Sequence, residues 1–210
     1  MTNESLCKSL EDQKVLAIIP ARQGSKRLPN KNALPFMGVP LLVWVANECR
    51  KSKYINRIVV STESEIISQV CLNHDIEVIK RPSELATDEA VKQDVIVHAT
   101  RHLTDTENYT PDIVLSLQAN SPEMTSLDLD KAIDFFHRKL YPGYAVKEVI
   151  SVSPGTMVQN AAFRIMTYKT VFQKTLSTYV GVYLCDYLDV HTKDDLDECE
   201  KRIRSRLKQK

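Results

Sequence analysis

Short apolar runs alternate with segments of helical periodicity through the first half of the chain. Residues 15–20 form a continuous run of mostly branched apolar side chains, the pattern of a strand that is buried on both faces of a sheet. Similar patterns predict strands at 15–20, 57–62, 76–80 and 113–118, and helices between them at 40–51, 63–74 and 88–103. Such alternation predicts a parallel sheet with helices on both faces.

The second half is less regular. Its pattern predicts helices at 127–140 and 193–207 and strands at 146–152, 161–166 and 179–184, which would make the sheet mixed. We therefore expect an α/β fold with a mostly parallel mixed sheet and helices on both faces, built as one domain over residues 15–210 after a polar leader at 1–14. Ligands of such sheets bind beyond the carboxyl ends of the strands, so the loops there are where we look for function.

Composition and charge exclude several classes of protein. The 210 residues are 43% hydrophobic and 26% charged, as in a globular domain, and no apolar run approaches the roughly 20 residues that span a bilayer. The net charge of +1 gives no overall excess for binding nucleic acid, and we interpret the basic stretch at 201–210 as a solvated helix end. Five cysteines without a C-x-x-C pair indicate reduced thiols. With no secretory signal, a cytoplasmic location is expected.

A basic loop follows the first predicted strand. Between residues 22 and 32 it carries four cations together with small and polar residues: Arg22, Gly24, Ser25, Lys26, Arg27, Lys31 and Asn32. Glycine allows close approach of the backbone, amide groups can surround an anion, and the cations can form charge-assisted hydrogen bonds with phosphate oxygens. The spacing matches neither a Walker A loop nor a Rossmann glycine motif. The loop therefore predicts phosphate binding of another type, with a merely solvated charged loop as the alternative.

The same residues resemble the signature of the acylneuraminate cytidylyltransferases, or CMP-sialic acid synthetases. The matching segment is Ile19-Pro20-Ala21-Arg22-x-Gly24-Ser25-Lys26-x-x-Pro29-x-Lys31-Asn32, followed in order by Val59 to Thr62, Arg81-Pro82-x-Glu84-Leu85-Ala86-x-Asp88, and Leu117-Gln118-x-x-Ser121-Pro122. The resemblance implies a nucleotidyltransferase (Rossmann-like) fold and an enzyme that transfers CMP from CTP to the anomeric hydroxyl of an ulosonic acid sugar, releasing pyrophosphate. It also implies a homodimer.

Roles for individual residues follow from this resemblance. Arg22 and Lys31 match the positions that contact the triphosphate and are the expected catalytic residues, whereas Gly24, Ser25, Lys26 and Asn32 match the nucleotide-binding loop. Arg81 resembles a residue near cytidine, and Gln118 and Ser121 resemble residues near the sugar. From the sequence alone, the alternatives are that Arg81 is an exposed arginine at a strand end and that Gln118 caps the turn after its strand.

The expected cofactor is Mg²⁺, with Mn²⁺ as an alternative, and here the sequence departs from the family. The family motif Asp-x-Asp-Thr-x-x-Asp reads Asp189-Val190-His191-Thr192-Lys193-Asp194-Asp195, so that His191 replaces a carboxylate. Asp189 could bind Mg²⁺ alone with triphosphate oxygens, or His191 could select a softer ion. Alternatively, His191 merely precedes a helix that Thr192 caps. Glu63 also stands where the family commonly has Asp, and Ala161 where it commonly has Gly.

Two other functions stay open. A non-catalytic nucleotide-binding relative with a decayed metal site would explain His191, and a transferase of the same architecture could use another nucleoside triphosphate. His98 and His102 have the helical spacing of a zinc pair, but Ala99 stands where the H-E-x-x-H motif has Glu. No G-x-S-x-G hydrolase motif occurs in the sequence.

Overall fold

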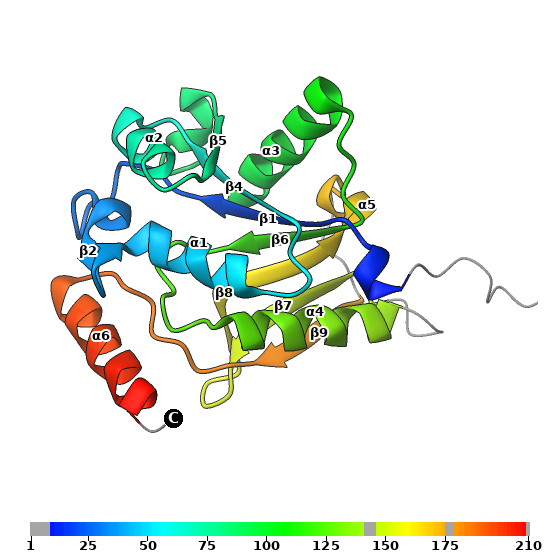
Figure 1. Ribbon diagram of the computed structural model, residues 1–210. Helices are drawn as coiled ribbons and strands as arrows, with labels where there is room; N and C mark the ends of the chain where they lie inside the picture. Colours follow the sequence, from blue (N-terminus) through cyan, green and yellow to red (C-terminus); the bar gives the residue numbers. More distant parts are fainter. Residues whose placement is uncertain (1–8, 141–145, 175–178, 209–210) are drawn as a thin grey trace, which may run out of the picture.

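A seven-stranded sheet of order β5-β4-β1-β6-β8-β7-β9 forms the centre of the molecule in the computed structural model, which describes residues 9–140, 146–174 and 179–208 (Figure 1). Neighbouring strands pair in parallel except β8, which runs antiparallel to β6 and β7. The strands are β1 (Val15–Pro20), β4 (Arg57–Thr62), β5 (Glu77–Lys80), β6 (Ile113–Leu117), β7 (Glu148–Ser153), β8 (Val158–Thr167) and β9 (Val180–Leu184). The predicted mixed, mostly parallel sheet is confirmed.

Helices cover both faces of this sheet, and the alternation of side chains along β1 shows why. Val15, Ala17 and Ile19 face one apolar cluster with α1 (Leu41–Lys51), α2 (Glu65–Leu72) and α4 (Ser126–Leu140). Leu16 and Ile18 face a second cluster with α3 (Lys92–Glu107) and α5 (Tyr168–Val171). Because β1 is buried on both faces, its sequence is a continuous apolar run.

The last helix, α6 (Lys193–Lys208), lies against α1 and a short hairpin rather than on the sheet (Figure 1). The hairpin consists of β2 (Pro35–Phe36) and β3 (Val39–Pro40), and Phe36 packs with Leu41, Leu196 and Ile203. This packing carries the segment before α6, including Asp189 and His191, back to the end of the sheet where the β1 loop lies. The sequence pattern predicts α6 but neither the hairpin nor α5.

Two predicted helices have different bounds in the structure, at Glu65–Leu72 and Lys92–Glu107. The helix predicted from residue 88 begins at Lys92, because Asp88 lies in the loop before it and pairs with two cations of the β1 loop. The helix predicted at 63–74 spans only Glu65–Leu72, since the Ser64 side chain accepts a hydrogen bond from the Ile67 amide and caps its start. Strand β8 also starts three residues before the predicted strand at 161–166.

The proposed leader at 1–14 lies partly outside the described residues, which begin at residue 9. Its described part contains a 3₁₀ turn, Leu10–Asp12, and Leu10 packs against the main apolar cluster. Four cysteines are described and all are free and buried: Cys49, Cys71, Cys185 and Cys199. Among the described residues, no helix combines the length and apolar character needed to cross a bilayer.

Candidate active site

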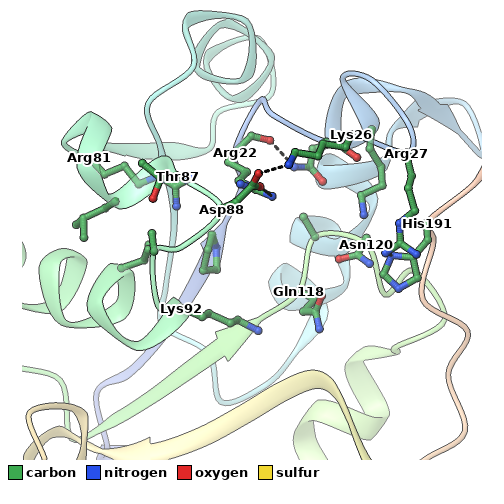
Figure 2. A pocket seen from close by; sticks show the side chains of 18 residues that line it. Arg22, Lys26, Arg27, Arg81, Thr87, Asp88, Lys92, Gln118, Asn120 and His191 are labelled. Atoms are coloured by element: carbon green, nitrogen blue, oxygen red, sulfur yellow. Dashed lines mark hydrogen bonds and ion pairs between the residues drawn. The ribbon is translucent and has the colours of Figure 1, made fainter. Parts of the chain in front are cut away.

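A cavity opens at the carboxyl ends of β1 and β6, where the sheet topology places ligand sites (Figure 2). Its walls come from the loop after β1, the segment between β5 and α3, the end of β6 and the segment before α6. The polar and charged residues in its lining are Arg22, Ser25, Lys26, Arg27, Lys31, Asn32, Arg81, Thr87, Asp88, Lys92, Gln118, Asn120 and His191. Positively charged side chains therefore greatly outnumber carboxylates in this lining, which suits an anionic ligand.

The loop after β1 is held by hydrogen bonds to the body of the domain. The Ala21 amide donates to the Ser61 carbonyl at 3.0 Å, which continues the β1–β4 pairing beyond the strand. Further on, the amide of the largely buried Asn32 side chain donates to the Arg22 carbonyl at 3.2 Å. Asn32, predicted to belong to the nucleotide-binding loop, therefore fixes the backbone that carries Arg22.

Arg22 and Lys26 converge on one carboxylate. Arg22 Nη2 and Lys26 Nζ each lie 2.6 Å from an oxygen of Asp88 (Figure 2). Hydrogen bonds from these two cations, Lys26 first, lower the pKa of Asp88. An entering phosphate would meet the same two cations, so Asp88 and a triphosphate compete for them.

Lys31 joins the β1 loop to the segment before α6. Its Nζ donates to the Val190 carbonyl at 2.8 Å. Burial lowers the pKa of Lys31, and the nearby charge of Asp189 opposes that change. Lys31 therefore lies at the junction between the basic loop and the segment before α6 that carries Asp189.

Asp189 is positioned by Ser121, whose hydroxyl donates to Asp189 Oδ1. Burial raises the pKa of Asp189, while the hydrogen bond from Ser121 and the charges of His191, Lys31 and Lys92 oppose that shift. Ser121 is fully buried and, like Asp189 and Gly24, is not part of the cavity lining. Ser121 therefore orients Asp189 from outside the cavity lining, and its place near a sugar stays a prediction.

His191 lies in the cavity wall beside Arg27, with Arg27 Nη2 3.0 Å from His191 Nδ1 (Figure 2). Burial, Lys31 and Arg27 together lower the pKa of His191. The backbone amides of His191 and Thr192 donate to Asp195 Oδ2, and Thr192 Oγ1 accepts from the Asp195 amide. This reciprocal cap agrees with the interpretation of His191 as the residue that precedes a capped helix.

The donor set for a metal ion is small. Within the described ranges, no three His, Cys, Asp or Glu side chains are grouped as metal ligands. Asp195 is engaged in the helix cap, and the Nδ1 atom of His191 faces a guanidinium, whereas Asp189 keeps one carboxylate oxygen that Ser121 does not occupy. Because Mg²⁺ is often held by a single carboxylate together with substrate phosphates, Asp189 fits this ion.

Arg81 is not an exposed arginine at a strand end, which was one of its two interpretations. Its side chain is 3% exposed, and its Nε and Nη2 donate to Glu63 Oε2 at 3.0 and 2.8 Å. The other oxygen of Glu63 accepts from the Gln23 amide at 2.9 Å. Burial disfavours the charged carboxylate of Glu63, but the hydrogen bonds from Gln23 and Arg81 outweigh it and lower the pKa. Glu63 thus ties Arg81 to the basic loop.

Gln118 extends into the cavity from the end of β6 (Figure 2). Its backbone amide donates to the Ala162 carbonyl at 2.9 Å, and its carbonyl accepts from the Ser121 amide at 3.3 Å. The turn is therefore closed by the backbone of Gln118, which leaves its side chain for a ligand.

Two charged residues of the lining were missed as site residues by the sequence analysis. Asp88 was part of the segment that carries the resemblance, but no role was assigned to it. Lys92 lies in the first turn of α3 and points into the cavity (Figure 2). No spacing or motif in the sequence marks Lys92, because only the fold brings the start of α3 beside the end of β6.

Comparison with known proteins places these features in a wider context. The sequence model of a family described as cytidylyltransferase matches residues 16–178. The N-acylneuraminate cytidylyltransferase of Escherichia coli O18:K1:H7 is 36% identical over 123 residues, which are 59% of this chain and 28% of that protein. The enzyme of the same name from Streptococcus agalactiae serotype III is 32% identical over 142 residues, 67% of this chain and 32% of that protein. The chain thus matches about a third or less of the length of these two relatives.

A solved structure of CMP:2-keto-3-deoxy-manno-octonic acid synthetase complexed with CTP has a similar fold. The two structures superpose with a TM-score of 0.73 over 92% of this chain and 99% of that one, at 13% sequence identity. At this level of identity, the similarity concerns the fold alone.

Proposed function

Because the chain belongs to the cytidylyltransferase family, we propose that it transfers CMP from CTP to the anomeric hydroxyl of a sialic acid-like ulosonic acid and releases pyrophosphate. The observation that carries this proposal is the convergence of Arg22 and Lys26 beside Lys31 in a cavity at the carboxyl ends of the strands. Cations fixed in such a cavity can bind a triphosphate and stabilise the charge that develops on the leaving pyrophosphate.

In this reaction Arg22 and Lys26 exchange the Asp88 carboxylate for phosphate oxygens. Lys31, held at the Val190 carbonyl, adds a further positive charge beside Asp189. Phosphoryl and nucleotidyl transfers depend mainly on positioning and electrostatic stabilisation, so Arg22 and Lys31 act catalytically without forming a covalent bond to the substrate. Gly24, Ser25 and Asn32 shape the loop that presents these cations.

Arg81 and Gln118 provide polar groups at other points of the same cavity. Arg81, oriented by Glu63, is proposed to contact the cytosine base, whose carbonyl oxygen and ring nitrogen accept hydrogen bonds from a guanidinium. Gln118 is proposed to bind hydroxyl groups of the acceptor sugar. Ser121 contributes by orienting Asp189.

Asp189 would hold a Mg²⁺ ion, which supplies Lewis-acid stabilisation of the triphosphate when bound. Ser121 keeps one oxygen of this carboxylate oriented, and the cations Lys31 and Lys92 favour its ionised form. His191, with Arg27 at its Nδ1, leaves only Nε2 for an ion such as Mn²⁺.

A second candidate is a nucleotide-binding relative without catalytic activity. The observation that favours it is the small donor set for metal, in which His191 replaces a carboxylate of the family motif. Such a protein would bind CTP through the same cations and would not turn it over.

The test is pyrophosphate release from CTP against N-acetylneuraminic, legionaminic, pseudaminic and 3-deoxy-octulosonic acids, with Mg²⁺ and Mn²⁺ in parallel. Release that requires both CTP and one acid supports the proposed transferase, and parallel reactions with ATP, GTP and UTP check the choice of nucleotide. CTP binding by calorimetry without release for any acid would reject the transferase in favour of the binding protein. Turnover that returns in His191→Asp would then assign the lost activity to the metal site.

A further inference from the structure

Lys92 is a cation of the cavity that lies apart from the basic loop. Its side chain extends from the first turn of α3 toward Gln118 at the end of β6, whereas Lys26 and Arg27 lie on the far side of the cavity (Figure 2). A triphosphate that is bound by the loop cations would leave the region between Lys92 and Gln118 for the second substrate.

The first turn of α3 is fixed by contacts of the next residue, Gln93. Gln93 Nε2 donates to the Val171 carbonyl at 2.6 Å, and Gln93 Oε1 accepts from Arg164 Nη1 at 2.7 Å. Arg164 in turn forms an ion pair with Glu148 of β7. These contacts tie the start of α3 to α5, β7 and β8, so the backbone of Lys92 is held relative to the sheet.

Charged side chains on other elements act on the ammonium group of Lys92. Loss of hydration lowers the pKa of Lys92 to about 8, the charge of Asp189 opposes this change, and Arg164 adds to it. The ammonium form therefore still predominates near neutral pH. Lys92 also lies at the N-terminus of a 16-residue helix, where the helix dipole adds a positive potential to the charge of the ammonium.

We propose that Lys92 is a specificity-determining residue for the acceptor and that its ammonium binds the acceptor's carboxylate. This inference rests on the proposed function, because an ulosonic acid carries its carboxylate on the anomeric carbon, next to the hydroxyl that attacks the α-phosphate. An ion pair at Lys92, with Gln118 beside it for a sugar hydroxyl, would place that hydroxyl between the end of β6 and the bound triphosphate. A neutral sugar of the same shape would lack the anchoring interaction.

The experiment compares an acid accepted by the wild-type protein with its primary amide, in the wild type, Lys92→Met and Lys92→Arg. Lys131→Met, at an exposed position on α4, is the matched control. A hydrogen bond to a charged group is commonly worth a factor of about 10 to 100. We therefore expect the wild type and Lys131→Met to prefer the acid by about that factor in kcat/KM. Lys92→Met should lose the preference, mainly through a higher KM for the acid, and Lys92→Arg should recover part of it.

Calorimetry of CTP binding separates this role from a contact with the nucleotide. The Kd for CTP should be the same in the wild type and in Lys92→Met. A higher Kd for CTP in Lys92→Met, together with an unchanged preference for the acid, would overturn the proposal and make Lys92 a phosphate contact. Full retention of the acid preference in Lys92→Met would overturn it as well, and the Tm of each variant checks that it is folded. If Lys92→Met does not fold, Lys92→Gln takes its place in the same comparison.

A failure of the proposed function would be distinguishable from a failure of this inference. If the wild type binds the acid but does not turn it over, the binding of acid and amide in the wild type and Lys92→Met tests Lys92 without catalysis. If the wild type neither turns over nor binds any of the acids, both the proposed function and the role of Lys92 are rejected.

Discussion

Replacing Glu63 by Gln tests the link between the buried Arg81 and the basic loop. Glu63 accepts two N–H groups of Arg81 on one oxygen and the Gln23 amide on the other. The substitution keeps the size of the side chain and one carbonyl oxygen but removes the charge that compensates a guanidinium only 3% exposed. Breaking a fully buried ion pair costs about 3–5 kcal/mol. Because the Glu63 side chain is 22% exposed and glutamine can still accept a hydrogen bond, we expect a loss of about 1.5–3 kcal/mol.

The assay is thermal and urea unfolding of the wild type, Glu63→Gln and the control Glu65→Gln. Glu65 pairs with Lys80 at the surface, and both side chains are more than two-thirds exposed. For a domain of this size, 1 kcal/mol lowers the Tm by about 2–4 °C, so Glu63→Gln should unfold about 3–12 °C below the wild type. The control should remain within about 1–2 °C of the wild type. Equal midpoints for the two variants would refute the reasoning that Glu63 stabilises a buried cation.

The difference in stability between the wild type and Glu63→Gln should depend on pH. The pKa of Glu63 is lower in the folded protein than its ordinary value of 4.5. The folded state therefore binds the proton less readily than the unfolded state, and the stabilisation is complete above the ordinary value. As the pH falls from that value through the lowered pKa, the stabilisation is lost. The stability gap between the wild type and Glu63→Gln should narrow over this acidic range, and a gap that widens on acidification would contradict the assignment.

Four further substitutions probe the cavity. Arg22→Ala and Lys31→Ala should each lower kcat/KM by about 100-fold or more, because each removes a fixed donor to the triphosphate, and unchanged steady-state rates would reject their catalytic role. Asp88→Asn should tighten CTP binding in calorimetry, since Arg22 and Lys26 would no longer be paired with a carboxylate, and weaker binding would show that Asp88 orients these cations instead. His191→Asp should lower the Mg²⁺ concentration needed for half-maximal activity, because it supplies a second oxygen ligand, and an unchanged Mg²⁺ titration would place His191 outside the metal site.

Much of the fold could be predicted because the apolar pattern of each buried strand is local. The run at Val15–Pro20 identifies β1 without reference to any other part of the chain. The start of α3 could not be found in this way, because Asp88 is held out of the helix by Arg22 and Lys26, more than 60 residues earlier in the sequence. The short strands β2 and β3 were missed for a similar reason, since they are stabilised by packing on α1 and α6 rather than by a pattern of their own.

The same difference between local sequence patterns and distant contacts applies to the candidate site. The loop from Arg22 to Asn32 is contiguous, so its residue types and their spacing are enough to predict phosphate binding. The groups that position the loop are scattered: Glu63 follows β4, Asp88 precedes α3, and the Val190 carbonyl precedes α6. Glu63, which in the sequence is only a minor departure from the family pattern, contacts both the loop and Arg81. A replacement that changes side-chain length while keeping charge can thus preserve an electrostatic link, whereas His191 changes the type of ligand at the proposed metal site.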